Sequence, residues 1–275
     1  MADPTPASPT RKIVVLARGL GTRMRRDTGV RLSDEQQRAA DGGAKAMMPI
    51  GRPFLDHCLM AYADAGFTEA CLVIGPEHRA VRDYYTALAP GRIRVDFAIQ
   101  DQPRGTADAV LAAERFVGDE RFVVVNGDNF YSVEALAALR AASGNASVGY
   151  ELGALVALGN VPRERVTAFA LLATDAAGHV VDIVEKPTPD QAAAHGEQSL
   201  VSMNCFAFTP AIFAAARTVR PSPRGELEIT DAVRALIASG TPVGVVPVRD
   251  GVLDLSSRGD VESVTAALAG HEVRL

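Results

Sequence analysis

Short apolar runs alternate with amphipathic stretches through the first half of the chain. The runs are rich in β-branched residues, as are strands that are buried on both faces of a sheet. The stretches between them repeat apolar positions at the spacing of a helix. This alternation predicts an α/β fold of three layers, Rossmann-like, with a mixed, mostly parallel sheet flanked by helices. The expected strands are 12–17, 70–75, 92–99 and 122–126, and the expected helices are 53–65, 77–88 and 106–116.

The pattern loosens after residue 145, where shorter strands mix with helices. No stretch has the composition of a linker and no segment repeats, so we predict a single domain over residues 11–275 in two halves, 11–145 and 146–275. The expected strands here are 166–172, 180–184, 200–208 and 243–248, with a turn at 177–179, and the expected helices are 210–219, 228–239 and 260–268.

Composition narrows the class of protein. Of the 275 residues, 48% are hydrophobic and 22% are charged, which is typical of a soluble globular protein. The net charge of −5 argues against a general nucleic-acid binder, although it permits a local basic pocket for phosphates. No apolar run approaches the length of a membrane span, so we expect no membrane contact.

The first residues and the cysteines bear on the cellular compartment. Residues 1–10 are rich in Pro, Ala and Thr and lack an apolar core, which predicts a disordered tail and not a signal peptide. Cys58, Cys71 and Cys205 lie far apart and form neither a metal-ligand spacing nor a disulfide framework. These features favour a reducing, cytoplasmic location.

The first predicted strand ends in a glycine-rich turn. Gly19 and Gly21 would let backbone N–H groups approach an anion, and Arg23 would add charge. Lys45 returns to the same place, so the arrangement predicts a polyphosphate cradle, although a plain strand-to-loop turn fits equally well. Two other motifs are excluded: Met24 stands where a dinucleotide fingerprint has glycine, and no lysine follows Gly21 as a P-loop requires.

A second candidate follows the strand 122–126. Asp128 comes just past this strand, and a carboxylate there can hold a divalent cation beside phosphates. The alternative is a turn aspartate, because Asn-Gly-Asp is good turn chemistry. Since ligands of parallel sheets lie beyond the carboxyl ends of the strands, the glycine turn, 100–105 and 126–129 are expected at one site.

Residues 16–24, followed by Lys45 and Pro49, resemble the signature of the sugar-phosphate nucleotidyltransferases, or nucleotide-sugar pyrophosphorylases. Further motifs of that family follow in its order across residues 12–260, among them Glu-Lys-Pro at 185–187. The stretch 221–231 looks most like the glucose-1-phosphate thymidylyltransferases. The resemblance implies a fold of the nucleotide-diphospho-sugar transferase type, with nucleotide bound by the first half and sugar phosphate by the second.

The resemblance also implies roles for individual residues. The glycine turn would hold a nucleoside triphosphate, the loop after residue 99 would read its base, and two aspartates would bind Mg²⁺. The implied catalytic residues are Arg23, Lys45, Lys186 and Arg224; the nucleotide-binding residues are Ala17, Arg18, Gly19, Leu20, Gly21, Thr22, Gln100, Gly105 and Thr106; the sugar-phosphate-binding residues are Asn126, Glu185, Ser202 and Asn204; and the metal ligands are Asp128 and Asp254.

The chain departs from the family's pattern at several positions. Arg18 stands where Ala or Gly is usual, Asn204 replaces a glycine, and Asp254 lacks its usual aromatic and glycine neighbours. The gap of 22 positions from Arg23 to Lys45 is about twice the usual one. The extra residues fall in 24–44, where a Ser-Gln capping box predicts a short helix over 33–40. We expect this insertion to be either a lid over the triphosphate, with Arg18 on a phosphate oxygen, or a solvated surface feature.

The implied activity is Mg²⁺-dependent transfer of a nucleotidyl group from a nucleoside triphosphate to a sugar-1-phosphate. A pyrimidine base is favoured through the thymidylyltransferase-like segment, and a glutamine amide can pair with a pyrimidine edge. Two alternatives stay open: a glycosyltransferase of similar fold that uses a nucleotide-sugar, and a non-catalytic sensor of nucleotides or sugar phosphates. The identity of the sugar and the oligomeric state are open as well, a homo-oligomer included.

Overall fold

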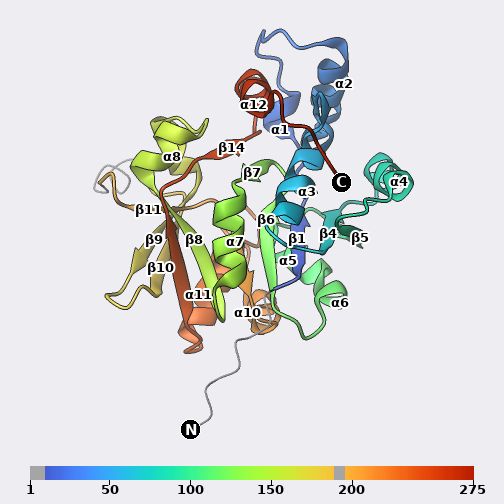
Figure 1. Cartoon of the computed structure of the whole chain (residues 1–275). Helices are drawn as coiled ribbons and strands as arrows, with labels where there is room; N and C mark the ends of the chain where they lie inside the picture. Colours follow the sequence, from blue (N-terminus) through green and yellow to red (C-terminus); the bar gives the residue numbers. More distant parts are fainter. Residues whose placement is uncertain (1–9, 189–195) are drawn as a thin grey trace.

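The structure is a computed structural model that describes residues 10–188 and 196–275 (Figure 1). A ten-stranded sheet runs through its centre, and helices cover both of its faces. Alternate residues of the first strand enter different cores: Ile13 and Val15 pack on one face and Val14 on the other. The predicted three-layer α/β architecture is therefore confirmed.

The first half of the sheet is parallel. Strand β1 lies between β4 and β6, and β5 pairs with the outer side of β4. β1, β4 and β6 are largely apolar because helices cover both of their faces, whereas β5, at the edge of the sheet, carries the exposed Arg94. Their bounds are β1 Lys12–Leu16, β4 Glu69–Ile74, β5 Arg94–Ile99 and β6 Phe122–Asn126.

The second half of the sheet is mixed. Strand β12 is antiparallel between β6 and β8, β13 runs parallel to β8, and β11, β9 and β10 complete the edge. Seven of the ten strands run in one direction, so the sheet is mostly parallel, as predicted. The bounds are β8 Asn145–Glu151, β9 Ala170–Thr174, β10 Val180–Glu185, β11 Leu200–Ser202, β12 Phe206–Phe208 and β13 Val243–Val248.

The predicted strand 200–208 is broken. Its first part, β11, pairs with β8 and β9, and its last part, β12, pairs with β8 and β6. Between them Asn204 takes a left-handed backbone conformation with φ of 55°, which an extended strand cannot contain. The prediction over 166–172 was also wrong in its first part, because Arg163–Ala168 forms a 3₁₀ turn, η2, ahead of β9.

Helices cover the sheet on two sides. On one side lie α3 and α7, and on the other α5, α10 and α11. The predicted helix 77–88 begins two residues late, since His78 accepts a hydrogen bond from the Gly75 backbone N–H and shapes a turn. The bounds are α3 Phe54–Asp64, α4 Arg79–Leu88, α5 Thr106–Ala112, α6 Glu114–Val117, α7 Val133–Ala141, α8 Leu152–Leu158, α10 Ala211–Thr218, α11 Ile229–Ala238 and α12 Asp260–Leu268.

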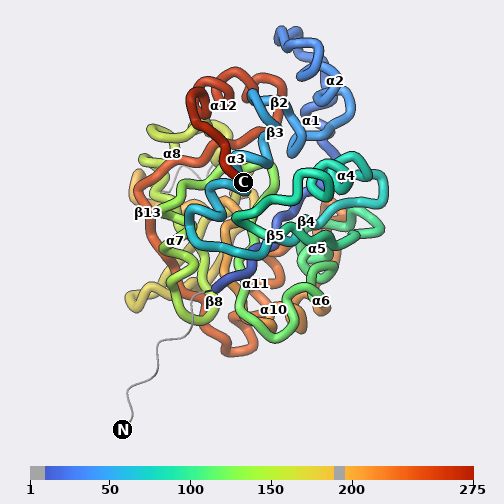
Figure 2. Tube along the Cα trace, turned by 45° about the vertical axis from the view of Figure 1, so that its right-hand side comes forward, coloured from blue at the N-terminus to red at the C-terminus, as the bar shows by residue number. Residues whose placement is uncertain are grey.

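The insertion after β1 is folded and anchored. Ser33 and Gln36 form the predicted capping box at the start of a helix, α2. In both views this insertion lies beside α12, which follows it by more than 200 residues (Figure 1 and Figure 2). The link is Arg258, 1% exposed, whose guanidinium donates to Met24 O at 2.9 Å and to Asp41 at 2.6 Å. The short elements here are α1 Thr22–Arg25, α2 Asp34–Gly42, η1 Lys45–Met47, β2 Pro49–Ile50 and β3 Arg52–Pro53.

Outside the main sheet, β7 (Asn129–Tyr131) pairs with β14 (Val252–Asp254) in a two-stranded sheet. Within the described residues, no helix is both long and apolar enough to cross a membrane. The three cysteines are buried and unpaired. Of the predicted tail, residues 1–9 lie outside the described part, while Thr10 is buried and its carbonyl accepts from Arg140 at 2.8 Å.

Candidate functional site

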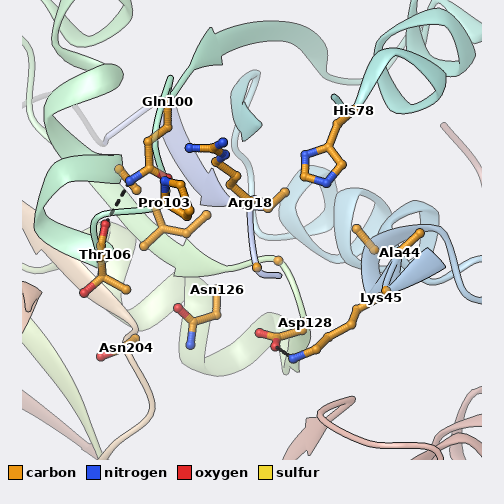
Figure 3. Close-up of a pocket in the computed structure, with 18 of the residues that line it drawn as sticks. Arg18, Ala44, Lys45, His78, Gln100, Pro103, Thr106, Asn126, Asp128 and Asn204 are labelled. Atoms are coloured by element: carbon orange, nitrogen blue, oxygen red, sulfur yellow. Dashed lines mark hydrogen bonds and ion pairs between the residues drawn. The ribbon is translucent and has the colours of Figure 1, made fainter. Parts of the chain in front are cut away.

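A cavity of about 390 Å³ opens at the carboxyl ends of the parallel strands (Figure 3). It continues into a second hollow of about 270 Å³, and the two share residues from both halves of the chain. Figure 3 shows Lys45 and Asp128 in contact at one side, with Arg18, Gln100 and Pro103 away from them. The residues common to both hollows are Arg23, Lys45, Thr106, Asn126, Asp128, Lys186, Asn204 and Glu226.

Most of the residues expected at the site border these hollows. Ala17, Arg18, Gly19, Gln100 and Gly105 line the first one. Two expected residues do not: Leu20 is 50% exposed outside the cavity, and Ser202 is buried within β11. The second hollow is bordered by the expected residues Gly21, Thr22, Glu185, Arg224 and Asp254.

Close packing against residue 43 explains why the turn has glycine at position 21. Gly21 has φ of 61°, and a Cβ there would lie 2.4 Å from the carbonyl oxygen of Gly43. Only glycine permits this contact, which brings residues 43–47 back against the turn. Lys45 reaches the cavity from that returning segment, so Gly21 helps to place Lys45.

Lys45 and Asp128 form an ion pair of 2.8 Å at the junction of the hollows. Burial lowers the pKa of Lys45, but the charge of Asp128, its hydrogen bond and the charge of Asp254 together outweigh burial, so the net pKa is raised above the usual value. Lys45 therefore stays an ammonium group across the physiological range. It is placed to neutralise an anion that replaces the carboxylate.

Asp254 reaches the site through β14. Its backbone pairs with Asn129, and Leu255 N donates to Asp128 O at 2.8 Å, so Asp128, in the turn just before β7, lies beside the end of β14 that carries Asp254. Burial, followed by the nearby charge of Asp128, raises the pKa of Asp254 to about 6. Arg165 from η2 forms an ion pair with Asp254 and another, at 2.5 Å, with Asp260.

The two aspartates suit a divalent cation. Mg²⁺ prefers oxygen ligands, and a cation would relieve the repulsion by which the charge of Asp128 raises the pKa of Asp254. No group of three or more His, Cys, Asp or Glu gathers as a metal site in the described part, so water and phosphate oxygens would complete the coordination.

The loop after β5 is held by hydrogen bonds to its neighbours. Gln100 donates from Nε2 to Gly105 O at 3.0 Å and to Asp108 at 2.8 Å. Gly105 has φ of 119°, and a Cβ there would lie 2.5 Å from the backbone of Leu227. Thr106 accepts from Ile229 N at 2.8 Å, so this loop is fixed to the segment that carries Arg224.

Carboxylates surround Arg224 at the second hollow. Its guanidinium lies 2.5 Å from Glu228, 3.7 Å from Glu185 and 3.8 Å from Glu226. Burial, and then the charge of Glu228, raise the pKa of Glu185. The expected residues Arg224 and Glu185 thus lie together at the site, and Arg224 already faces three carboxylates there.

Strained backbone marks this side of the cavity. Lys186 and Asn204 have φ of 48° and 55°, and among the described residues other than glycine only Ala89 also has positive φ. Such conformations cost about 1–3 kcal/mol each and persist where surrounding structure enforces them. Asparagine tolerates this region better than lysine does, which fits its place where the family has glycine.

Three lining or supporting residues were not among those expected at the site from the sequence. His78 borders the cavity with a pKa lowered by burial, and Glu226 borders both hollows. Arg165 supports Asp254 from η2, one residue before the predicted strand 166–172. The ion-pair partner Asp254 of Arg165 is distant in sequence, whereas His78 accepts from the nearby Gly75 and Glu226 faces the nearby Arg224.

The insertion gives the cavity little charge. Arg26, Arg31 and Arg38 are exposed and border neither hollow. The insertion instead contributes Gly43 and Ala44, next to Lys45. Whether it moves when a ligand binds stays a prediction.

The chain is similar to known proteins both in sequence and in fold. The sequence profile of the family described as Nucleotidyl transferase matches residues 12–255. Among curated relatives, the low-salt glycan biosynthesis nucleotidyltransferase Agl11 of Haloferax volcanii is 29% identical, over 83% of this chain and 58% of its own length. A UTP–glucose-1-phosphate uridylyltransferase, AglF, of the same organism is 28% identical over 88% and 90%. A glucose-1-phosphate thymidylyltransferase of Streptomyces antibioticus is 32% identical over 84% and 59%.

The chain thus spans less than two thirds of the length of two of these relatives. Among solved structures, a UDP-glucose pyrophosphorylase complexed with UDP-glucose superposes with a TM-score of 0.72 at 20% identity, over 94% of this chain and 98% of the other. At that identity the likeness shows a shared fold.

Proposed function

The chain belongs to the nucleotidyl transferase family, and we propose that it transfers a nucleotidyl group from a nucleoside triphosphate to a sugar-1-phosphate, forming a nucleotide-sugar and pyrophosphate. The observation that supports this most is the joined pair of hollows, which share Lys45 and Asp128 from one half of the chain and Lys186 and Asn204 from the other. Two substrates that meet at a phosphate need such an arrangement.

In this reaction a phosphate oxygen of the sugar-1-phosphate attacks the α-phosphorus, and pyrophosphate leaves. The second pKa of a phosphate monoester is about 6, so the attacking oxygen is already ionised near neutral pH. The reaction therefore requires no general base. Catalysis then consists of positioning and charge neutralisation. We assign the triphosphate to Arg23 and Lys45, and the sugar phosphate to Lys186 and Arg224.

Mg²⁺, held by Asp128 and Asp254, would neutralise charge on the two phosphates. Asp128 also pairs with Lys45, and Asp254 with Arg165. Lys45 would then turn from the carboxylate to the triphosphate. Arg165, which also pairs with Asp260, would keep Asp254 oriented.

The remaining residues would position the two substrates. Gln100 and Gly105 would contact the base, for which we favour a pyrimidine. Asn126, Glu185 and Asn204 would face the sugar. Glu185 stands beside the proposed phosphate ligand Arg224, so it can accept hydrogen bonds from sugar hydroxyls while it orients that guanidinium.

A pyrophosphate-release assay tests this proposal. The protein would be incubated with Mg²⁺, each of four or five nucleoside triphosphates and several sugar-1-phosphates, and released pyrophosphate would be measured through a coupled enzyme. Release that requires both substrates supports the proposal. A glycosyltransferase would consume a nucleotide-sugar without releasing pyrophosphate, and a sensor would bind nucleotide without turnover.

Lys186 provides a more specific prediction. Replacing it with Ala is expected to raise KM for the sugar-1-phosphate by roughly tenfold or more and KM for the triphosphate much less, because one charge-assisted contact to phosphate is lost. Initial rates with each substrate varied in turn measure both constants. Lys186→Arg keeps the charge at the same strained position and serves as the control. Equal effects on both KM values would place Lys186 elsewhere in the mechanism.

A further inference from the structure

Three neighbouring strands end in a row beside the cavity, and two long polar side chains follow them. Arg18 comes after β1, Gly75 after β4 and Gln100 after β5. The register is fixed by Ala17 N donating to Val73 O at 2.9 Å and Gln100 N to Ile74 O at 2.9 Å. Adjacent strands lie about 4.8 Å apart, so Arg18 and Gln100 start roughly 10 Å from each other and flank one gap.

Arg18 carries a donor that the described chain leaves unused. Its side chain is 7% exposed, and Nε and Nη2 face Glu77 at 3.3–3.4 Å. Nη1 is buried and has no hydrogen-bond partner, although the residue lines the cavity. A guanidinium is always charged and can only donate, and leaving a buried donor unpaired is costly. The orphan nitrogen therefore calls for an acceptor supplied by a ligand.

Gln100 presents the opposite chemistry. Both partners of its Nε2, the Gly105 carbonyl and the Asp108 carboxylate, can only accept, and Asp108 is also paired with Arg104 at 2.5 Å. Because both partners can only accept, the amide nitrogen must face them and Oε1 must point away from them. Its Oε1 accepts no hydrogen bond from the described residues, and Gln100 borders the cavity as well. The free group of Gln100 is thus an acceptor.

We propose that Arg18 is a specificity-determining residue, which with Gln100 reads the base of the nucleotide and selects an imide edge, as in uracil or thymine, over cytosine. This rests on the proposed function. Uracil places a carbonyl oxygen beside a ring N–H, which match the Nη1 donor and the Oε1 acceptor. Cytosine has no N–H on this ring nitrogen, so acceptor meets acceptor at Oε1 whichever side is turned to Arg18, and with its amino group there donor also meets donor at Nη1.

The position of Arg18 favours the base over the phosphates. Figure 3 shows its guanidinium turned toward Gln100 and Pro103, while the ion pair of Lys45 and Asp128 lies on the other side of the cavity. Glu77, beside Arg18, would repel a phosphate and tolerates a neutral base. In this proposal Arg18 contacts the base and not, as expected from the sequence, a phosphate oxygen.

Calorimetric titration with UTP and CTP tests this, because the two ligands differ only at the base edge. In the presence of Mg²⁺ the unmodified protein should bind UTP at least about tenfold more tightly than CTP. Arg18→Ala should weaken UTP binding about tenfold and CTP binding less than threefold, and should weaken uridine monophosphate binding as much as UTP binding. The control is Arg249→Ala, whose side chain is 80% exposed after β13 and which should change neither.

Two results would overturn the proposal: an equal loss for UTP and CTP, or a loss for UTP that disappears with the monophosphate, which would indicate a phosphate contact. If Arg18→Ala does not fold, judged by thermal unfolding, Arg18→Met fills the same space without a donor and gives the same comparison. Equal binding of UTP and CTP with intact pyrophosphate release would sink this inference alone. Binding of neither, with no release from any pair of substrates, would sink the proposed function.

Discussion

Asp128→Asn is expected to lower the turnover number at least about 100-fold, which is roughly 2.7 kcal/mol of transition-state stabilisation. Asp128 borders both hollows, pairs with Lys45 and lies beside Asp254. Asparagine keeps the shape but removes the charge that would attract Mg²⁺, so the loss should fall on turnover while the protein stays folded. Pyrophosphate release at saturating substrates, measured over a range of Mg²⁺ concentrations, gives the comparison.

Asp119→Asn is a suitable control, because Asp119 is exposed on the loop before β6 and borders neither hollow. It should leave turnover and its Mg²⁺ dependence unchanged. Thermal unfolding of both variants separates a catalytic loss from misfolding. Activity of Asp128→Asn within a few-fold of the unmodified protein would remove Asp128 from the metal site.

Arg258→Met is expected to detach the insertion and to lower the free energy of unfolding by about 2 kcal/mol. The guanidinium of Arg258 is buried and donates to Met24 O at 2.9 Å and Gln37 at 2.8 Å, so its loss leaves acceptors unpaired. The pair with Asp41 adds little, because that carboxylate is largely exposed. Hydrogen exchange over residues 24–44 should become faster, and urea unfolding gives the change in stability.

Arg25→Met offers a matched control within the same segment. Arg25 is exposed and donates once, to Gly42 O at 2.9 Å, so its replacement should cost about 0.5 kcal/mol or less. Unchanged exchange over 24–44 in Arg258→Met would show that other contacts hold the insertion. Repeating the exchange with UTP and Mg²⁺ tests the lid: if the glycine turn gains protection and 24–44 does not, the insertion is a fixed surface feature.

The parallel half of the fold could be predicted because the sequence pattern within each of its strands is sufficient to recognise the strand. A strand covered on both faces must be apolar throughout, so β1, β4 and β6 stand out as runs, and the residues after them were expected together. The mixed half is less regular: β7 and β14 have three residues each, and β8 begins at Asn145. Such strands are set by partners far along the chain, so local pattern predicts them poorly.

The same distinction applies to the site. Gly21, Gln100 and Asp128 follow predicted strands, so a rule about strand ends located them. Arg165 and Arg258 act through partners 89 and 217 residues away, and a single arginine carries no periodic signal. Asn204 shows the limit within one run, because the largely apolar stretch 200–208 predicted a single strand and gave no sign that the strand changes partner there.

The pairing of β7 with β14 has a consequence for biosynthesis. Asp128 is made early, but the strand that brings Asp254 to it is among the last parts of the fold to be translated. A nascent chain that stops before Val252 can bury β1, β4 and β6, yet it has only one of the two carboxylates proposed to hold Mg²⁺. The ribosome-bound protein would thus remain inert toward triphosphates until β14 has been translated and has paired with β7.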